Sequence, residues 1–439
     1  MKTVNVGICG LGTVGGGTFN VLTRNNIEIN AKAGREITIS HVGARMLNPD
    51  CDTSSTQVSD DVFSVANDPK VDILVELMGG TTVAKDLVLT AIRNGKHVVT
   101  ANKALIAEFG NEIFAEAVKH KVTVSYEAAV AGGIPIIRSM REGLVANRIE
   151  WLAGIINGTG NFILTEMRDK GRAFEDVLKE AQELGYAEAD PTFDVEGIDA
   201  AHKLVILASI AFGMPLQYDK VFCEGISTIK PEDVAYADEL GYRIKHLGIA
   251  RRRETGVELR VHPTLIPTSR LIANVDGVMN AVLVKGDAVG PTLYYGAGAG
   301  SEPTASAVIS DIVHVSRLIN GDDLEVNYDS TVPHLGFALD HLSDFNILPI
   351  EDVETAYYLR MSALDRPGVL SKVTQILSDA GISIEALIQK EPQDGQEHVP
   401  VILLTNCAVE RQIISAIQKI EALESVAGDV IRIRVESLK

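Results

Sequence analysis

Residues 4–15 read VNVGICGLGTVG, and they decide the first part of the fold. A short β-branched run is followed by the pattern GxGxxG, whose glycines are Gly10, Gly12 and Gly15. Between a strand and a helix, the first glycine makes a tight turn, the second lets the backbone approach a pyrophosphate, and the third allows close helix packing. The N-terminus of the helix adds a positive dipole. The stretch therefore predicts a dinucleotide-binding domain, and a glycine-rich turn in a nucleotide-free fold is the alternative.

Alternating strands and helices extend outward from this loop to about residue 147. The patterns predict strands and helices at 4–9, 14–30, 37–42, 72–78, 84–94, 97–100 and 122–126. Strand, helix and strand in succession indicate a mainly parallel sheet with right-handed crossovers. A later Gly-rich loop at 296–307, GAGAGSEPTASA, opens a further helix. We expect a Rossmann-type domain over residues 1–147, completed by the helix at 303–320.

The end of the second predicted strand bears on the choice of cofactor. It reads Val42-Gly43-Ala44-Arg45 and lacks the acidic residue that usually contacts the ribose of NAD. Arg45 could instead meet the 2′-phosphate of NADP, whereas the alternative is a solvated surface arginine. The sequence therefore favours NADP, with NAD as the second possibility.

The remainder of the chain divides into further regions. After residue 147 the pattern changes to a second α/β region, which we expect to span 148–302. Residues 340–354 are polar and suit a linker. The tail, residues 355–439, has a compact βαββαβ order, in which the Asp394-Gly395 pair marks the central hairpin turn.

The stretch from residue 185 to residue 203, GYAEADPTFDVEGIDAAHK, crowds acidic residues and a lysine against the apolar run LVILASIAF. Asp194 is predicted to cap a helix on which Asp199 and Lys203 lie one turn apart on the same face. Charges at the edge of a core indicate a functional site. The alternative is an exposed i,i+4 ion pair worth about 0.3–0.5 kcal/mol, with Asp190-Pro191 as an ordinary turn. These residues alone do not decide between the two.

Two shorter stretches carry further candidate residues. Thr100-Ala101-Asn102-Lys103 ends the fourth predicted strand, at the edge of an open sheet where ligands bind. Lys103 could reach a substrate oxygen or the nicotinamide, or be a surface lysine at a helix start. Glu127 precedes a run of small residues whose carbonyls could bend toward a hard cation. A glycine-rich turn between domains explains that run equally well.

The composition argues against several classes of protein. The net charge is −19, so nonspecific binding to nucleic acid or to anionic membranes is not expected. No apolar run reaches the roughly 20 residues of a membrane span, and Met1-Lys2 leads directly into a strand, so no signal peptide is expected. The four cysteines lack CxxC spacing and are expected to be reduced, as in a cytoplasmic protein. The histidines form no HxxxH or HExxH pair, so a zinc site is not expected.

Five motifs in order carry a resemblance to a known family. They are TANK at 100–103, EAAVAGGIP at 127–135, NGTGNFIL at 157–164, the stretch at 185–203 and GAGAG at 296–300. With these motifs spread over nearly its whole length, the chain resembles monofunctional homoserine dehydrogenase. The usual GTTN reads GTGN here, which bears on the role of Gly160. The tail resembles an ACT domain through its βαββαβ order and the motif DRPGVL at 365–370.

The resemblance implies an α/β fold with three parts and a specific reaction. The parts are the Rossmann domain, an α+β catalytic and dimerisation domain over 148–302, and the C-terminal ACT domain. The reaction is the NAD(P)H-dependent interconversion of L-aspartate 4-semialdehyde and L-homoserine, on the branch leading to threonine, isoleucine and methionine. Hydride that arrives at the aldehyde carbon creates an alkoxide, which needs a proton and positive charge at its oxygen.

By the same resemblance, the candidate site residues have separate roles. Lys203 is the expected proton donor, and Lys103 is expected to assist polarisation and to touch the cofactor. Glu188 and Asp199 are expected to hold the α-ammonium group of the substrate. Asp194 is expected to orient Lys203 or the substrate.

The resemblance also implies contacts to the cofactor and to a cation. Besides the three glycines and Arg45, cofactor contacts are expected at Leu11, Thr13, Val14 and Gly300. A monovalent cation, expected to be Na⁺, would be held by Glu127 and the carbonyls of Val130, Gly132 and Ile134.

The ACT-like tail implies regulation and assembly. Asp365, Arg366 and Gly368 are expected to contact an amino-acid effector, which the family suggests is L-threonine, because a helix N-terminus there would face its carboxylate. Dimerisation without any ligand is the alternative. A homodimer or homotetramer is expected, and removing the residues after about 350 is expected to abolish inhibition and to leave catalysis.

Two other functions are also compatible with parts of the sequence. One is a different NAD(P)-dependent dehydrogenase of amino acids or β-hydroxyacids, which would not act on homoserine. The other is a non-catalytic regulator that senses NADP and an amino acid, but it leaves Lys103, Glu188, Asp199 and Lys203 without a role. An assay of homoserine with NADP⁺ and with NAD⁺ separates all three.

Overall fold

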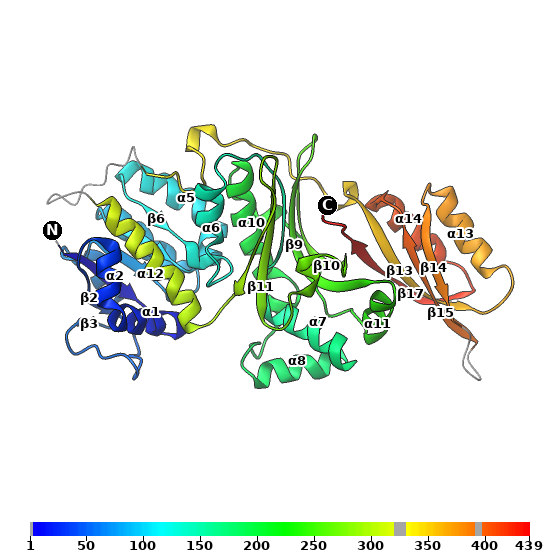
Figure 1. Cartoon of the computed structure of the whole chain (residues 1–439), viewed down its shortest axis with the longest axis horizontal. Helices are drawn as coiled ribbons and strands as arrows, with labels where there is room; N and C mark the ends of the chain where they lie inside the picture. Colours follow the sequence, from blue (N-terminus) through cyan, green and yellow to red (C-terminus); the bar gives the residue numbers. More distant parts are fainter. Residues whose placement is uncertain (1–2, 320–330, 391–396) are drawn as a thin grey trace. The chain divides into compact units, whose positions relative to one another are not determined.

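The computed structural model describes residues 3–319, 331–390 and 397–439, and the chain folds into two compact units (Figure 1). The first unit combines Met1–Gly158, Asp199–Val221 and Val278–Phe345. The second unit combines Thr159–Ile198, Phe222–Gly277 and Asn346–Lys439. Each unit is therefore built from segments that lie far apart in the sequence.

The first unit contains a six-stranded sheet with the order β3-β2-β1-β4-β5-β6, in which every neighbouring pair is parallel. This confirms the prediction of a parallel, Rossmann-type sheet, whose strand order places a ligand crevice beside β1. Its strands are β1 (Val4–Cys9), β2 (Ile37–Gly43), β3 (Gln57–Ser59), β4 (Ile73–Glu76), β5 (His97–Thr100) and β6 (Val124–Ser125). The accompanying helices are α1 (Thr13–Arg24), α2 (Asn26–Ala33), α3 (Val62–Asn67), α4 (Thr82–Arg93), α5 (Lys103–His120) and α12 (Ser301–Leu318).

The single helix predicted over 14–30 is wrong, because the chain breaks it at Asn25. Asparagine side chains compete with the helical backbone for hydrogen bonds and favour helix ends, and two asparagines follow Arg24 here. The Asn26 side chain donates to the Ile37 carbonyl (3.2 Å), which ties the start of α2 to the start of β2. The break therefore lets α2 lead directly back into the sheet.

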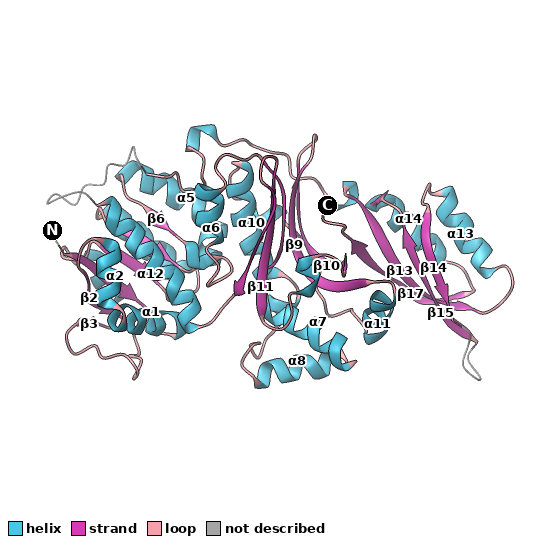
Figure 2. Cartoon of the chain, viewed as in Figure 1, coloured by secondary structure: helices cyan, strands magenta, loops and turns pink. Residues whose placement is uncertain are grey.

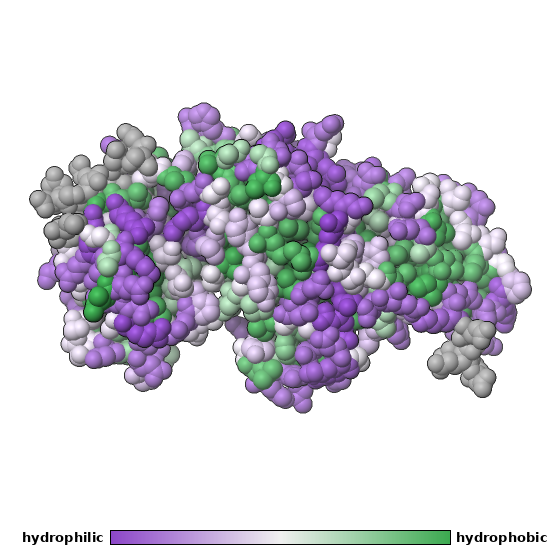
Figure 3. Space-filling model, in the orientation of Figure 1, coloured by the Kyte–Doolittle hydropathy of each residue, from purple (hydrophilic) through white to green (hydrophobic). Residues whose placement is uncertain are grey.

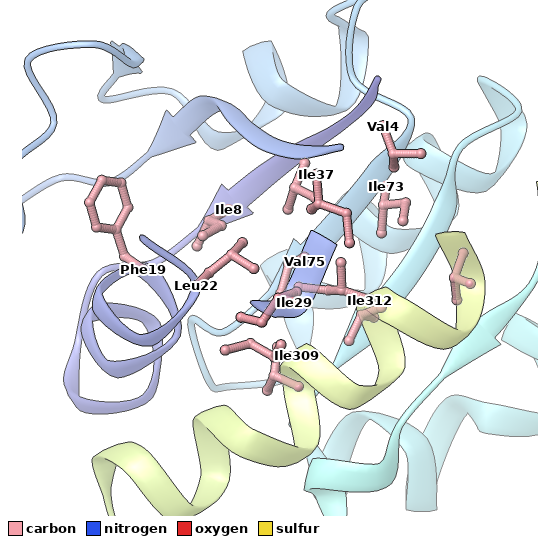
Figure 4. Close-up of a cluster of buried hydrophobic side chains, with 14 of the residues drawn as sticks. Val4, Ile8, Phe19, Leu22, Ile29, Ile37, Ile73, Val75, Ile309 and Ile312 are labelled. Carbon is pink, nitrogen blue, oxygen red and sulfur yellow. The ribbon is translucent and has the colours of Figure 1, made fainter. Parts of the chain in front are cut away.

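Buried hydrophobic side chains from the sheet, α1, α2 and α12 form one core in this unit (Figure 4). The sheet contributes residues such as Ile8 and Ile73, and α1 contributes Phe19 and Leu22. The helix α12 adds Val308, Ile309, Ile312 and Val315, although some 200 residues separate it from β5. Its apolar face is spaced at one helical turn and closes the same core.

The first unit also holds an antiparallel group of three strands in the order β12-β11-β7. These strands are β7 (Ile149–Ile155), β11 (Met279–Gly286) and β12 (Gly290–Ala297). Two helices of this unit matter for the site: the short α6 (Ile136–Arg138) and α10 (Ile198–Phe212), which is buried along most of its length. The helix α10 carries the LVILASIAF run that the sequence assigned to a core.

The second unit is built around strands in the order β9-β10-β17-β13-β15-β14. Its first part contains α7 (Gly158–Lys170), α8 (Phe174–Glu183), α9 (Thr192–Val195), β8 (Phe222–Cys223), α11 (Pro231–Glu239), β9 (Tyr242–Arg252) and β10 (Val257–Pro267). Its C-terminal module contains β13 (Glu354–Leu364), α13 (Val369–Asp379), β14 (Ile384–Gln389), β15 (His398–Thr405), β16 (Ala408–Val409), α14 (Glu410–Glu421) and β17 (Val426–Val435). The predicted βαββαβ order of the tail is confirmed, while its predicted Asp394-Gly395 turn lies outside the described residues.

The strands β13 and β15 of the C-terminal module, drawn in Figure 2, carry buried side chains on both faces. Alternate residues of β13, such as Tyr357 and Leu359, pack with α13 and α14 in one core. Tyr358, between them, joins Ile402 and Ile433 in a second core that α7, α8 and α11 complete. The last strand, β17, also pairs in parallel with β10. The module is therefore part of the core of the second unit.

No helix in the described part of the chain is long and apolar enough to cross a membrane. On the face drawn in Figure 3, hydrophobic patches are interrupted by hydrophilic surface. All four cysteines are free thiols, with Cys9 and Cys51 buried and Cys223 and Cys407 exposed.

Candidate active site

Two lysines and one aspartate meet in the first unit. Lys103 is the first residue of α5, and Asp199 and Lys203 lie one turn apart on α10. The Asp199 carboxylate contacts both lysines: Oδ1 lies 3.0 Å from Lys103 Nζ, and Oδ2 lies 2.6 Å from Lys203 Nζ. The predicted i,i+4 pairing of Asp199 with Lys203 is confirmed, but the Asp199 carboxylate is buried and only 12% of the Lys203 side chain is exposed. An exposed surface ion pair is therefore the wrong description of these residues.

Residues at the end of β7 complete this cluster, and the sequence analysis gave them no role. The Asn157 side chain donates from Nδ2 to Asp199 Oδ2 (2.9 Å). Lys203 Nζ donates to the carbonyl of Ile156 (2.7 Å). Asn157 belongs to the NGTGNFIL motif, which was the available signal, but its partner is 42 residues away in the chain. Only the fold brings the three elements together.

The electrostatics of the cluster favour an ionised Asp199. Burial alone opposes ionisation, but the charges of Lys203 and Lys103, with hydrogen bonds from Lys203 and Asn157, hold the pKa of this carboxyl well below its ordinary value. Each carboxylate oxygen is in contact with a lysine, so Asp199 keeps two ammonium groups close to one another in a mostly buried place. This arrangement supplies positive charge and N–H donors at one point.

The position of Lys103 depends on a capped helix start. The Asn102 side chain accepts a hydrogen bond from the Leu105 N–H (3.1 Å) and donates to the Gly80 carbonyl (2.6 Å). It therefore satisfies an N-terminal amide of α5 and ties the helix to the loop after β4. Lys103 follows at the carboxyl end of β5, at the sheet edge where the sequence placed it.

The glycine-rich loop has the backbone that a pyrophosphate requires. Gly10 has φ +96°, a left-handed conformation that favours glycine. A Cβ on Gly15 would lie 1.9 Å from the Gly10 carbonyl oxygen, so only glycine allows α1 to start so close to β1. Apart from Gly12 and its two chain neighbours, no described residue has a heavy atom within 4 Å of a Cβ built on Gly12, and no side chain caps the N-terminus of α1. The loop therefore fits a dinucleotide.

The other predicted cofactor residues lie around this loop or at strand ends of the first unit. Leu11 is buried, Thr13 is exposed at the start of α1, and Val14 is partly buried beside the core. Arg45 is exposed just after β2. Gly300, with φ +119°, precedes α12.

The loop at Gly300 touches the first glycine-rich loop. The Ser301 hydroxyl donates to the Thr13 carbonyl (2.8 Å), and a Cβ on Gly17 would lie 2.4 Å from the same hydroxyl oxygen. The structure thus brings two glycine-rich stretches together that lie nearly 300 residues apart in the sequence.

Glu127 is a buried carboxylate that lies beside a second buried carboxylate, Asp311. Its oxygens accept hydrogen bonds from the N–H groups of Ile137 and Arg138 (2.8 Å each), and its own N–H donates to Asp311 (2.7 Å). Burial, and then the charge of Asp311, raise the pKa of Glu127 to about 7. A cation next to this carboxylate would offset the cost of keeping it ionised.

The backbone beyond Glu127 turns sharply. Ala131 and Gly132 both have left-handed backbones, with φ +55° and +46°, and a Cβ on Gly132 would lie 2.4 Å from the Gly298 carbonyl oxygen. Among the described residues, no group of three or more His, Cys, Asp or Glu side chains could hold a metal. The Glu127 carboxylate and the turned backbone after it offer oxygen atoms, which are the ligands that a hard cation prefers.

The remaining acidic candidates lie in the second unit. Glu188 is exposed, and its carbonyl accepts from the Gln182 side chain (3.0 Å). Asp194 is partly buried inside α9. The prediction that Asp194 caps the helix of Asp199 is wrong, because Gly197, with φ +85°, separates α9 from α10.

Two acidic residues without a predicted role have local partners. Asp190 accepts from the Thr192 N–H (3.1 Å) at the start of α9. The Glu196 carboxylate accepts from the Ser227 hydroxyl (2.9 Å). In the same unit, the Thr159 hydroxyl of the NGTGNFIL motif donates to the Tyr186 carbonyl (2.6 Å). This bond ties that motif to residues 185–198, the acidic stretch.

The three predicted effector residues share one place in the C-terminal module. Asp365, Arg366 and Gly368 line a hollow of about 460 Å³ at the turn from β13 into α13. Gly368 precedes α13 with φ +91°, and Asp365 accepts from the Gln389 side chain (2.9 Å). The hollow lies at a helix N-terminus, where an anionic group binds well.

Comparisons with known proteins agree with this organisation. The family model for the NAD binding domain of homoserine dehydrogenase matches residues 10–127, the model for homoserine dehydrogenase matches residues 135–313, and the ACT domain model matches residues 357–422.

Full-length relatives extend the same likeness over the whole chain. The homoserine dehydrogenase of Pseudomonas aeruginosa is 65% identical over 438 residues, and that of Neisseria gonorrhoeae is 54% identical over 444 residues; both matches cover 100% of each chain. The crystal structure of a homoserine dehydrogenase from Thiobacillus denitrificans has a TM-score of 0.93 and 62% identity, and the match covers 100% of this chain and 99% of that one. The chain therefore belongs to the homoserine dehydrogenase family, NAD(P)-dependent oxidoreductases that here carry a C-terminal ACT domain.

Proposed function

We propose that the cluster of Lys103, Asp199 and Lys203 is the acid–base centre for the interconversion of L-aspartate 4-semialdehyde and L-homoserine. The observation that carries this proposal is the contact of one buried carboxylate with both lysines. Hydride transfer to an aldehyde leaves an alkoxide, and a nearby ammonium group can both stabilise the developing charge and supply the proton.

Lys203 is the proposed proton donor, and Lys103 polarises the reacting oxygen. Lys203 is the more enclosed of the two lysines, with 12% of its side chain exposed against 33% for Lys103. Its contacts with Asp199 and Ile156 hold its Nζ in one place, which positions the proton. In the direction of homoserine oxidation, the same group accepts the proton of the hydroxyl.

Substrate binding is assigned to the acidic stretch that precedes α10. Glu188 is proposed to hold the substrate α-ammonium, and Asp194 to orient the substrate, since an amino group in a site requires carboxylates. Asp199 was expected to share this role. Its contacts with both lysines support a different proposal, in which it positions them.

The bound dinucleotide supplies or accepts the hydride, and the chain provides its binding site. The amides at the start of α1 and the glycines Gly10, Gly12 and Gly15 are proposed to hold the pyrophosphate, with Leu11, Thr13, Val14 and Gly300 around them. The exposed Arg45 at the end of β2 supports a preference for NADP over NAD, because a guanidinium pairs well with a phosphate.

A structural Na⁺ ion is proposed at Glu127, with the carbonyls of Val130, Gly132 and Ile134. The buried carboxylate and the sharply turned backbone support this assignment.

An amino-acid effector, L-threonine, is proposed to bind in the hollow lined by Asp365, Arg366 and Gly368. Family membership supports a homodimer or homotetramer.

A direct assay tests the proposed reaction. The wild-type chain is expected to oxidise L-homoserine, with NADP⁺ preferred to NAD⁺, as followed by absorbance of the reduced cofactor. Lys203→Ala is expected to lower kcat by about a thousandfold or more while NADPH still binds, because the proton donor is lost but the glycine-rich loop is untouched.

The outcomes separate the competing functions. Turnover of Lys203→Ala near the wild-type rate would contradict the role of this lysine. A wild type that reduces NADP⁺ with other hydroxy acids but not with homoserine would favour a different dehydrogenase, and cofactor binding without any turnover would favour a regulator.

A further inference from the structure

We infer that Glu224 and Arg434 are positioning residues for substrate binding, through which the last strand of the C-terminal module holds the acidic stretch of the active site in place. This acidic stretch is defined as residues 185–198. The inference rests on the proposed substrate role of Glu188 and Asp194 within it. All of its contacts lie inside the second unit.

The first link is a buried arginine shared between two carboxylates. Arg434, on β17, has a fully buried side chain. Its Nε and Nη2 donate to Glu410 at the start of α14 (2.8 and 2.5 Å), and its Nη1 donates to Glu224 (3.1 Å). The guanidinium also lies over the Phe222 ring, 5.0 Å from its centroid. One arginine therefore joins the C-terminal module to the segment that follows β8.

Glu224 is fixed on its other side by the strands β9 and β10. Its N–H donates to the Val261 carbonyl (2.8 Å), and its carbonyl contacts His246 Nε2 (3.0 Å). Its carboxylate is also reached by Arg432 of β17 (3.3 Å). With only 29% of the side chain exposed, this carboxylate faces two arginines in a partly desolvated place, where charge-assisted hydrogen bonds are strong.

The next three residues after Glu224 bind the acidic stretch directly. The Ile226 N–H donates to the Val195 carbonyl (2.9 Å), and the Ser227 hydroxyl donates to the Glu196 carboxylate (2.9 Å). A Cβ on Gly225 would lie 2.8 Å from the Val195 carbonyl oxygen and 2.2 Å from Glu196 Oε2, so the backbone of residue 225 approaches the acidic stretch more closely than a side chain would allow. Glu196, which had no role in the sequence analysis, thus becomes an anchor of the acidic stretch.

The same contacts give the effector hollow a physical route to the substrate residues. The strand β13 carries the turn at Gly368 and pairs with β17, where Tyr357 is opposite Arg434. The Tyr357 hydroxyl also donates to Glu410 (2.9 Å), the second partner of Arg434. A shift of β13 would therefore displace Arg434 both through its strand pairing with Tyr357 and through Glu410. Because Arg434 is bonded to Glu224, this displacement would reach residues 225–227.

The test separates substrate binding from chemistry in the full-length chain. Glu224→Gln keeps the shape of the side chain and its backbone contacts but removes the charge that pairs with Arg434 and Arg432. We expect the KM for L-homoserine to rise about three- to tenfold, with the KM for NADP⁺ and kcat changed less than about twofold. Glu239→Gln is the matched control, because it removes another ion pair to the C-terminal module, with Lys390, that does not involve residues 185–198 or 225–227.

A second variant covers the case in which Glu224→Gln fails to fold. Ser227→Ala removes the hydroxyl that anchors Glu196, leaves Arg434 and its carboxylates intact, and is expected to raise the homoserine KM about two- to fivefold. A homoserine KM within a factor of two of wild type in both variants overturns the inference, as does an equal rise in Glu239→Gln. A wild type that does not oxidise homoserine would instead refute the proposed reaction, so the two failures are distinguishable.

Discussion

Asn157, which follows β7, contacts the carboxylate at the centre of the lysine cluster. Its side chain donates to the same Asp199 oxygen that contacts Lys203. Asn157→Ala is expected to lower kcat for homoserine oxidation by about ten- to a hundredfold, because a hydrogen bond to a buried charge is worth about 1.5–3 kcal/mol. The KM for NADP⁺ should change little, and steady-state kinetics with both substrates varied would measure both effects.

Asn111→Ala provides the control for this prediction. Asn111 has a comparable structural role in the same unit, since its side chain accepts from the Leu216 N–H (3.1 Å) and donates to the Leu216 carbonyl (3.0 Å). Its loss should lower the thermal midpoint without a matching loss of kcat. If Asn157→Ala kept the wild-type kcat, or if both variants lost kcat equally, Asn157 would be a purely structural residue.

At this scale, the sequence predicted one half of the cluster. Helical spacing placed Asp199 and Lys203 on one face, and the contact between them follows from that spacing alone. The contacts of Asp199 with Lys103 and Asn157 depend on where α5 and β7 end relative to α10, which no local pattern contains. The resemblance assigned Asp199 to the substrate ammonium, whereas its contacts with Lys103 and Asn157 are visible only in the folded chain.

In the loop between β1 and α1, Gly15 and Gly12 are needed for different reasons. Gly15→Ala would force a methyl group against the Gly10 carbonyl and should displace the start of α1. We expect a loss of about 2 kcal/mol or more in stability together with weaker NADPH binding. Gly12→Ala meets open space and should keep the wild-type thermal midpoint, while its methyl group obstructs the pyrophosphate and weakens binding.

Thermal unfolding and a fluorescence titration with NADPH would measure the two properties separately. The informative result is the contrast between the variants. A Gly12→Ala protein that binds NADPH as tightly as wild type would show that the pyrophosphate does not approach this backbone. A Gly15→Ala protein of normal stability would show that α1 can shift without cost.

Some elements were predictable from the sequence and others were not. The strands β1 and β5 have the bounds that their β-branched runs predicted. The strand β7 was missed: nearly all of its residues are buried, so it lacks the alternation of apolar and polar residues that marks a half-buried strand. The strand β12 begins at a glycine in a partly exposed stretch and also gives a weak signal.

The sequence correctly predicted the elements of the C-terminal module, but not its integration into the second unit. The module buries one face of its sheet against α13 and α14 and the other against helices that precede it by more than 100 residues. Contacts of such long range have no local signature. They change the expectation that the tail can be removed without affecting catalysis.

Buried ion pairs near the junction of β10 and β17 also link the C-terminal module to the rest of the second unit. Arg260 is fully buried between Glu258 (2.9 Å) and Glu436 (2.5 Å), and Glu436 also pairs with Arg251 (2.8 Å). Burial opposes the ionisation of Glu436, but the charges of Arg260 and Arg251 lower its pKa to about 2. Each of these groups is acceptable in the interior only because its partner is present.

Truncation after residue 345 should therefore remove enzyme rather than regulation alone. The deletion would remove Glu436, Arg360 and Arg434, which are the partners of Arg260, Asp233 and Glu224 in that order. It would also expose the apolar core that Tyr358 helps to fill. Breaking a single buried pair costs about 3–5 kcal/mol, so several together exceed the usual stability of a domain, about 5–15 kcal/mol. We expect the truncated chain to be largely insoluble and inactive with homoserine. The control is the full-length chain carrying Asp365→Ala and Arg366→Ala, which should fold and oxidise homoserine normally. Both residues line the hollow and lie outside both cores. A soluble truncated chain with the wild-type kcat/KM would show instead that the C-terminal module is dispensable for the fold of the second unit.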